Sequence, residues 1–210
     1  MVLREWDWLR DQVAPRGVAL DAVIVADDEN LDLAREYGFA TVECENNRMG
    51  RKWNAGFRHA SYADVAVLIG SDNWIHSDAF DRVPENAVSA ARSLDFVDLQ
   101  RGVLQHASGN GLIPWLIPRS LLEPSNFAPL PDRMQRGTEP MLIHALGHPP
   151  IVHRACAPGV DFKSADSTSP YAGVANSIGD GAEHDAWAAL ATHYPQHLVD
   201  AAQTLSEEIA

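Results

Sequence analysis

The sequence predicts an α/β protein built on a doubly wound, mostly parallel sheet. Apolar runs of the length of a buried strand alternate with stretches of helical periodicity through the first third of the chain. Short turns separate these runs, and strands that alternate with helices in this way form parallel sheets covered by helices. A length of 210 residues suits one domain with a sizeable core, and the sequence contains no internal repeat and no clear linker.

The elements of the first third follow from local signals. A helix is expected over residues 3–13, because Trp6, Leu9 and Val13 form one apolar stripe that ends before Pro15. The next expected elements are a strand at 20–26, a helix at 31–37, a strand at 40–44, a helix at 50–62 and a strand at 65–69. Gly38 closes the second of these helices.

Beyond residue 70 the alternation is less regular. Pro84 divides residues 78–92 into two short helical pieces, and Pro195 divides or kinks a closing helix at 185–205. The elements expected between them are strands at 96–105, 112–117 and 151–156, a helix at 138–146, a turn at Asn110-Gly111, and loops at 124–131 and 157–181.

Composition narrows the class of protein. The formal charge of −13, from 29 acidic and 16 basic residues, argues against a broad grip on nucleic acid, which needs a basic face. A local basic groove stays open, supplied by Arg48, Arg51, Lys52 and Arg58 or by Arg101, Arg119, Arg133 and Arg136. No apolar run spans a bilayer, and the start MVLREWDW lacks the order of a signal peptide. We therefore expect a cytoplasmic, reduced protein.

Carboxylates follow two of the expected strands directly. Asp27 and Asp28 follow the first strand in VIVADDEN, and Asp72 follows the second in ADVAVLIGSDNW. In an open α/β sheet this edge binds ligands, and carboxylates there suit Mg²⁺ or Mn²⁺ held together with a phosphorylated ligand. The alternative interpretations are an N-cap for Asp27 or Asp28 and a turn-forming role for Asp72.

The segment between these corners, RMGRKWNAGFRHA, indicates a helix that approaches the same edge. Gly50 and Gly56 permit close backbone approach, and the positive N-terminal end of the helix faces the expected ligand. Arg48 and Lys52 are placed to meet phosphate or base there.

In their order and spacing these segments resemble the nucleotide-sugar half of GT-A fold glycosyltransferases, most closely the large inverting family 2 with its small bacterial and phage members. The matching positions are the Asp27-Asp28 pair, Asn54-Ala55-Gly56 on the helix, and Gly70-Ser71-Asp72 as a DxD-like metal motif. The resemblance covers roughly the first ninety residues. It implies one GT-A-like domain, with a nucleotide-sugar half at 1–92 and an acceptor half with a C-terminal helix at 93–210.

Two departures from the family pattern stand out. The first acid of the DxD motif is Gly70 here, and the acid that often follows is Asn73, so Asp72 is the carboxylate left to hold Mn²⁺ or Mg²⁺. The family also begins with a strand before its first helix, and this chain starts inside that helix. Either the strand was lost with a late start, or the sheet is completed in another way.

The resemblance assigns the acceptor and the catalytic base to the second half. Glu139, at a helix start in RGTEPM, resembles the family's catalytic base. The alternative is that Glu139 only interacts with the dipole of that helix. Asp132 is a weaker candidate for the base. His153 is a candidate metal or phosphate ligand, and a structural role is the alternative for this residue. Lys163 is a candidate diphosphate ligand in a loop that closes over the site.

The function expected from these features is metal-dependent, inverting transfer of a sugar from a UDP- or GDP-sugar. Asp27, Asp28, Arg48, Lys52, Asn54, Asp72 and Lys163 then bind the donor. One alternative is a non-catalytic binding or scaffold protein on a degenerate GT-A fold. Nucleotidyl transfer is a further alternative, which the absence of a Gly-rich, Lys-containing N-terminal loop disfavours. The acceptor is open; an Ala- and Asp-rich composition fits a phage or actinobacterial source, and a phage source would favour a modified DNA base.

Overall fold

The computed structural model describes residues 2–45, 47–70, 72–108, 114–135, 138–154, 156–164 and 179–209. For residues 2–4, 28–30, 138–139 and 209 it describes the helical backbone but not the side chains. The protein is mixed α/β, with three sheets in its described part. None of the described helices has the length and apolar character that a membrane crossing requires.

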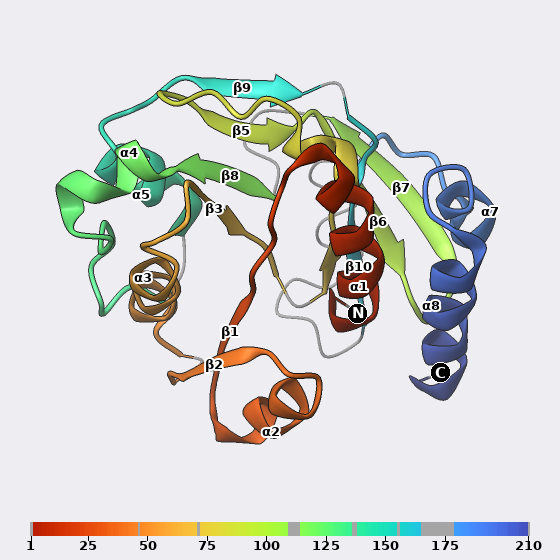
Figure 1. The fold of residues 1–210 in the computed structure, drawn as a ribbon. Coiled ribbons are helices and arrows are strands. Elements are labelled where there is room, and N and C mark those ends of the chain that lie inside the picture. The colour runs from red at the N-terminus through yellow and green to blue at the C-terminus, as the bar shows by residue number, and fades with distance from the viewer. Residues whose placement is uncertain are drawn as a thin grey trace.

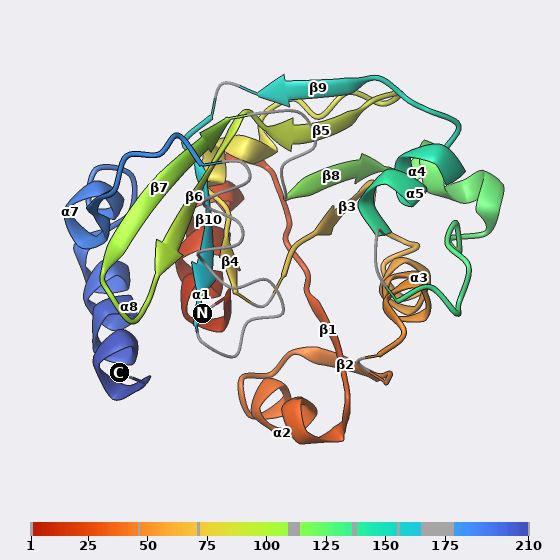
Figure 2. The ribbon, with the colours of Figure 1, turned by 180° about the vertical axis from the view of Figure 1, so that it is seen from behind.

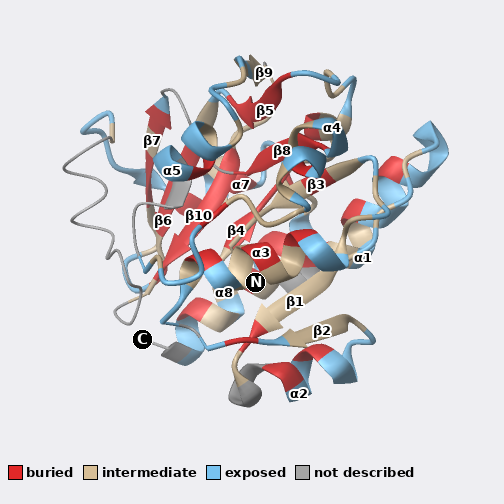
Figure 3. Ribbon diagram, turned by 90° about the vertical axis from the view of Figure 1, so that its left-hand side faces the viewer, coloured by how far each residue is buried: buried red, intermediate tan, exposed pale blue. Residues whose placement is uncertain are grey.

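The elements predicted for the first third are present. They are α1 (Val2–Val13), β1 (Val23–Ala26), α2 (Asp28–Glu36), β2 (Ala40–Glu43), α3 (Met49–His59) and β3 (Val65–Leu68). Strands β1 and β2 pair in parallel and form a two-stranded sheet. This sheet lies at the lower end of the molecule beside α2, and most residues of its strands are only partly buried (Figure 3).

A four-stranded sheet has the order β3-β8-β5-β9. Its further strands are β5 (Val88–Ala91), β8 (Trp115–Pro118) and β9 (Ile151–Arg154). Because β8 is antiparallel to both neighbours and β5 is parallel to β9, strands β3, β5 and β9 end at the same edge. Figure 1 shows α3, α4 (Arg119–Leu122) and α5 (Thr138–Ala145) beside this sheet, where Phe57 and Leu142 pack against Trp115.

A five-stranded sheet has the order β11-β7-β6-β10-β4. Its strands are β4 (Asn73–Trp74), β6 (Ser93–Asp98), β7 (Val103–Ser108), β10 (Gly159–Lys163) and β11 (His184–Asp185). Trp74, Val97 and Phe162 pack with Leu190 of α7 (Ala186–Leu190) and Leu198 of α8 (Gln196–Ile209). These two helices lie beside β7 in Figure 2.

The expectation of a mostly parallel sheet is wrong for the described strands. Only three of the eight described strand pairings are parallel, and β3 pairs in antiparallel fashion with β8. The regions 1–92 and 93–210 also share both larger sheets, since β3 and β5 pair with β8, and β4 pairs with β10. They therefore fold as one interleaved unit.

Four further local expectations differ from the structure. Residues 78–92 hold one 3₁₀ turn, η2 (Ser77–Phe80), followed by strand β5 instead of two helical pieces. The single strand expected at 96–105 is a hairpin of β6 and β7, whose turn includes Gly102 at φ +61°. The loop expected at 124–131 begins inside η3 (Glu123–Ser125), and the loop expected at 157–181 contains β10. The expected Asn110-Gly111 turn lies outside the described residues, whereas the division of the closing helix near Pro195 is confirmed.

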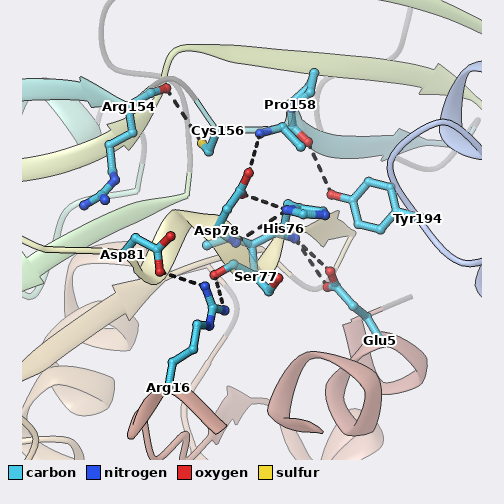
Figure 4. A network of polar contacts seen from close by, with 12 residues as sticks. Glu5, Arg16, His76, Ser77, Asp78, Asp81, Arg154, Cys156, Pro158 and Tyr194 are labelled. Carbon is cyan, nitrogen blue, oxygen red and sulfur yellow. Dashed lines mark hydrogen bonds and ion pairs between the residues drawn. The ribbon is translucent and has the colours of Figure 1, made fainter. Parts of the chain in front are cut away.

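A network of polar contacts ties the N-terminal helix to both larger sheets (Figure 4). Glu5, only 1% exposed, accepts the Ile75 N–H with both carboxylate oxygens, and burial raises the pKa of this carboxyl well above its ordinary value. His76 Nδ1 lies 2.7 Å from Asp78 Oδ1, and Asp78 Oδ2 accepts the Ala157 N–H at 3.1 Å. The link between β9 and β10 is thereby joined to η2.

Helix α3 is docked closely on the loop that precedes α5. The Gly50 N–H donates to the Met134 carbonyl at 3.0 Å, and a Cβ on Gly50 would lie 2.1 Å from the Pro131 carbonyl oxygen. Only glycine permits this approach, because real Cβ atoms do not come so near a backbone oxygen. The position of the 131–134 loop therefore depends on residue 50.

Replacing Gly50 with Ala should destabilise the protein by about 1–3 kcal/mol, because the added methyl group overlaps backbone that cannot move independently. Gly56→Ala in the same helix is the matched control, since its Cβ would meet Val25 Cγ2 at an acceptable 3.4 Å. The control should be neutral or stabilising by up to about 1 kcal/mol, because Ala favours helix. Urea unfolding of both variants measures the difference. Equal stabilities would show that the loop moves freely.

Candidate functional site

The candidate site is centred where β4 meets β10. The two strands are antiparallel, and Asn73 lies directly opposite Asp161. The Phe162 N–H donates to the Asp72 carbonyl at 2.8 Å, and the Gly70 N–H donates to Asn73 Oδ1 at 2.9 Å. These contacts fix the corner after β3 against the end of β10. Asp72 thus lies beside a strand that comes ninety residues later in the chain.

This corner leaves little room for a side chain at position 70. A Cβ on Gly70 would lie 2.6 Å from both Asn73 Oδ1 and Asp72 Oδ1. Asn73 is itself 5% exposed and engaged by the Gly70 N–H. A side chain at position 70 therefore fits only if the Asp72 and Asn73 side chains move, and moving Asn73 would cost its bond to the Gly70 N–H.

An ammonium group lies between two carboxylates at this corner. Lys163 Nζ is 2.7 Å from Asp161 Oδ1 and 3.6 Å from Asp72 Oδ2. The Lys163 and Asp161 side chains are 9% and 13% exposed, whereas that of Asp72 is 44% exposed. Burial raises the pKa of Asp161 to about 6, against the opposing effect of the Lys163 charge. With both acids ionised, the three side chains carry one uncompensated negative charge.

Lys163 was expected in a closing loop, and the structure places it otherwise. It is the last residue of β10, with its strand paired to β6 on one side and to β4 on the other. Val160 and Phe162 face the core under α7 and α8, which leaves Asp161 and Lys163 on the opposite face. The alternation in GVDFK is a strand signal, but flanking Pro and Ser residues conceal it.

A second cation and carboxylate influence each other near the end of β1. Burial lowers the pKa of Lys52 on α3, and the charges of Asp27 and Cys44 raise it, so these groups lie near one another. Asp27 occupies the N-cap position of α2, but its side chain makes no capping hydrogen bond. Asp27 is thus close enough for its charge to act on Lys52. The Asp28 side chain lies outside the described part.

Other predicted donor-site residues have structural partners. Asn54, 1% exposed, donates to the Leu130 carbonyl at 2.7 Å and to Asp132 Oδ1 at 3.0 Å, and it accepts the Leu130 N–H at 3.1 Å. Its amide is thus occupied in holding the loop over α3, and the same bond restrains Asp132. Arg48 Nε lies 3.1 Å from Glu45 Oε2.

The N-terminus of α3 does not offer all its amides to a ligand. The Gly50 N–H is bonded to the Met134 carbonyl. The expectation that this helix end faces a phosphate is therefore wrong for Gly50, because the loop before α5 satisfies that donor. Arg48 is the N-cap residue and makes no side-chain capping bond.

Glu139 comes from helix α5 beside the four-stranded sheet, and His153 comes from the edge strand β9 of that sheet. Glu139 is the second residue of α5, and its side chain lies outside the described part. His153 is on β9, with β8 and β5 between it and β3, a separation of about 14 Å at the usual strand spacing. Its Nδ1 is buried without a hydrogen-bond partner among the described residues. The structure does not bring His153 to Asp72.

The described residues contain no group of three or more His, Cys, Asp or Glu side chains able to hold a metal ion. Asp72 offers a half-exposed carboxylate 3.6 Å from the Lys163 ammonium. One carboxylate with an ammonium beside it is not by itself a site for Mg²⁺ or Mn²⁺, and such an ion would need substrate phosphates and water to complete its shell. Asp72 would hold such an ion, and no described residue completes a cage around it.

A separate cleft of about 340 Å³ lies between η2 and β9. Its lining residues are Asp78, Asp81, Arg82, Val152, Arg154 and Cys156. No residue predicted for the donor site lines this cleft.

Among known proteins, no family model, no curated protein and no solved structure matches the chain.

Asp161→Asn should flatten the pH dependence of stability between about pH 4 and pH 6. The pKa of about 6 in the folded protein lies above the ordinary aspartate value of 3.8, so folding is favoured by protonation of this group. Its contribution is complete below about pH 4 and is lost as the pH rises through 6. Relative to the variant, the parent should lose up to roughly 3 kcal/mol across this window. Urea unfolding at several pH values measures it, and parallel curves would contradict the assignment.

Proposed function

We propose that the protein is an inverting glycosyltransferase with a GT-A-like scaffold, which uses a nucleotide-diphosphate sugar and a divalent cation. The observation that carries the proposal is the contact between Asp72 and Lys163. Both were assigned to the donor diphosphate from separate parts of the sequence, and β10 brings them within 3.6 Å. A carboxylate for a metal ion and an ammonium for phosphate oxygens are the groups that a diphosphate leaving group needs.

The proposed division of roles follows the two corners. Asp27 and Lys52 bind the nucleoside end of a UDP- or GDP-sugar, where a carboxylate accepts from a base imide or ribose hydroxyl. Asp72 holds Mn²⁺ or Mg²⁺ on the diphosphate, and Lys163 neutralises its oxygens. Glu139 takes the proton from the acceptor hydroxyl as the anomeric carbon is attacked. Acceptor screens should include hydroxylated DNA bases together with sugars.

A binding protein on a degenerate GT-A fold is the second candidate. The observation that favours it is the occupation of expected ligand groups by the protein itself. Asn54 and the Gly50 N–H are bonded to the 130–134 loop, and Lys163 is paired with Asp161. Donor titrations with and without Mn²⁺ separate the two functions, because a binding protein of this kind gains no stability from any UDP- or GDP-sugar.

Asp72→Ala should weaken metal-dependent binding of the donor by at least about a hundredfold, because it removes the carboxylate that holds the ion. The fold should survive, since this side chain is half-exposed. Calorimetric titration of UDP- and GDP-sugars in Mn²⁺ measures the effect, with exposed Asp64→Ala as the control. Unchanged donor affinity in the Asp72 variant would remove Asp72 from the site.

Glu139→Gln should slow sugar transfer by a factor of roughly 10² to 10⁴, the usual contribution of a general base. Donor affinity should stay nearly constant, because the base acts on the acceptor. Single-turnover kinetics and donor titration measure the two quantities separately, and Glu85→Gln provides an exposed control. Weakened donor binding with normal turnover would place Glu139 in the donor site or helix cap. The base would then be sought at Asp132 or in the 161–166 segment.

A further inference from the structure

The cleft between η2 and β9 presents two guanidinium groups. Arg82 follows η2 and Arg154 is the last residue of β9, and both line this cleft of about 340 Å³. Among the described residues, neither guanidinium has an ion pair or a hydrogen bond. Six other arginines in the described ranges each pair with a carboxylate. The cleft therefore offers two cations to a ligand.

The two carboxylates that line the same cleft are already engaged. Asp81 accepts a hydrogen bond from Arg16 Nη1 at 2.7 Å, and Asp78 Oδ2 accepts the Ala157 N–H at 3.1 Å. The other oxygen of Asp78 is inaccessible to solvent and lies 2.7 Å from His76 Nδ1. Both acids are thus directed at protein groups (Figure 4).

The charge around the cleft favours an anion, although the chain as a whole is acidic. With Arg16 included, the arginines at the cleft outnumber its carboxylates by three to two. Burial raises the pKa of the Cys156 thiol, and the Asp78 charge adds to this effect, so the thiol contributes no negative charge at neutral pH. In a chain of formal charge −13, this cleft is a local site of positive charge.

The placement of the two guanidinium groups suits a phosphate better than a carboxylate. Arg82 comes from the η2 side of the cleft, and Arg154 extends from β9 toward η2 in Figure 4. A carboxylate presents one planar edge, which a single guanidinium satisfies with two parallel hydrogen bonds. A phosphate presents oxygens in several directions and can accept from two guanidinium groups at once. Val152, 40% exposed, adds an apolar wall for a small organic substituent.

The backbone at Arg82 is held in a left-handed conformation. Its φ is +53°, which is uncommon for residues other than Gly, Asn and Asp. The preceding Asp81 is anchored by Arg16, which also donates to the Ser77 carbonyl at 2.8 Å. Such strained backbone persists where its surroundings fix it, and it occurs often at ligand sites. Glycine would remove the strain, so the presence of Arg82 favours a use for its side chain.

We propose that this cleft binds a small phosphate monoester, whose oxygens accept hydrogen bonds from Arg82 and Arg154 while its organic group lies against Val152. No residue assigned to the nucleotide-sugar donor lines this cleft. The phosphate site is therefore separate from the donor site, and the failure of either proposal leaves the other standing.

Calorimetric titration with phenyl phosphate tests the site. Arg82→Gly and Arg154→Gln should each weaken binding by at least about tenfold, because each removes a charge-assisted hydrogen bond. Arg82→Gly should not lower the thermal midpoint, because glycine adopts the left-handed conformation without strain. Arg58→Gln is the matched control, because it removes the same charge from an exposed residue of α3 outside the cleft. The control should change the affinity by less than about twofold.

Cys156 reports whether the phosphate occupies this cleft. Its thiol lines the cleft and is partly buried, whereas Cys44, the only other cysteine, is buried. Phenyl phosphate should slow the alkylation of Cys156 by iodoacetamide in the parent. The same concentration should leave the rate unchanged in Arg82→Gly. Mass spectrometry of the digested protein measures the two cysteines separately.

Four results would overturn the proposal. Parent protein that binds no phenyl phosphate has no such site, and binding without protection of Cys156 places the ligand elsewhere. An equal loss of affinity in Arg58→Gln and Arg82→Gly would show only diffuse attraction. Benzoate bound as tightly as phenyl phosphate would make the cleft a carboxylate site. Loss of affinity confined to the two cleft variants, with phenyl phosphate preferred over benzoate and Cys156 protected, supports the proposal.

Discussion

The pairing of β10 between β6 and β4 is the constraint on which the candidate site depends. One face of β10 supplies Val160 and Phe162 to the core beneath α7 and α8, and the other carries Asp161 and Lys163. Burying charged groups is unfavourable unless they are paired, and the 2.7 Å contact between these two side chains provides the pairing. The hydrophobic face thus fixes the strand, and the strand fixes the polar corner at Asp72.

This corner is supported from the other side by the N-terminal helix. Glu5 of α1 accepts the Ile75 N–H just after β4, and His76 and Asp78 extend the contacts to the link before β10 (Figure 4). Trp74 lies in edge contact with Phe162 and packs near Tyr194. Because such buried polar contacts are costly when broken, α1 restrains both ends of the β4 and β10 corner. The placement of Asp72 therefore draws on residues from the first to the last third of the chain.

The sequence predicts well those parts whose signals are local. Every element up to β3 has a regular spacing of apolar residues and is followed by residues that end a helix or strand. The predicted boundaries therefore differ from the structure by only a few residues. Strand β10 escapes prediction because its five residues lie among Gly, Pro and Ser, which indicate a loop. The β6 and β7 hairpin is read as one strand because its turn depends on Asp98 side-chain bonds and the positive φ of Gly102. Strand partners are also not local, which is why a parallel sheet was expected.

The same distinction applies to the site. The sequence predicts that Asp27 and Asp72 follow strands, and in the structure Asp27 follows β1 and Asp72 lies between β3 and β4. A carboxylate after a buried strand is a local pattern. The role of Asn54 is set by Leu130 and Asp132, more than seventy residues away, and no pattern around Asn54 shows it. Lys163 was found by its residue type, but its position relative to Asp72 requires the β4 and β10 register.

In a chain with a formal charge of −13, cations that meet an anionic ligand must be held in place locally. A lysine left unpaired and buried would tend to lose its proton, because burial disfavours the charged form. A neighbouring carboxylate opposes that loss, as the Asp27 charge does for Lys52. Such a pair presents a preformed charge and reduces the ordering that binding would otherwise require. If the two lysines contact phosphate or base as proposed, the acids near them are what keeps them charged: Asp161 for Lys163, and Asp27 for Lys52.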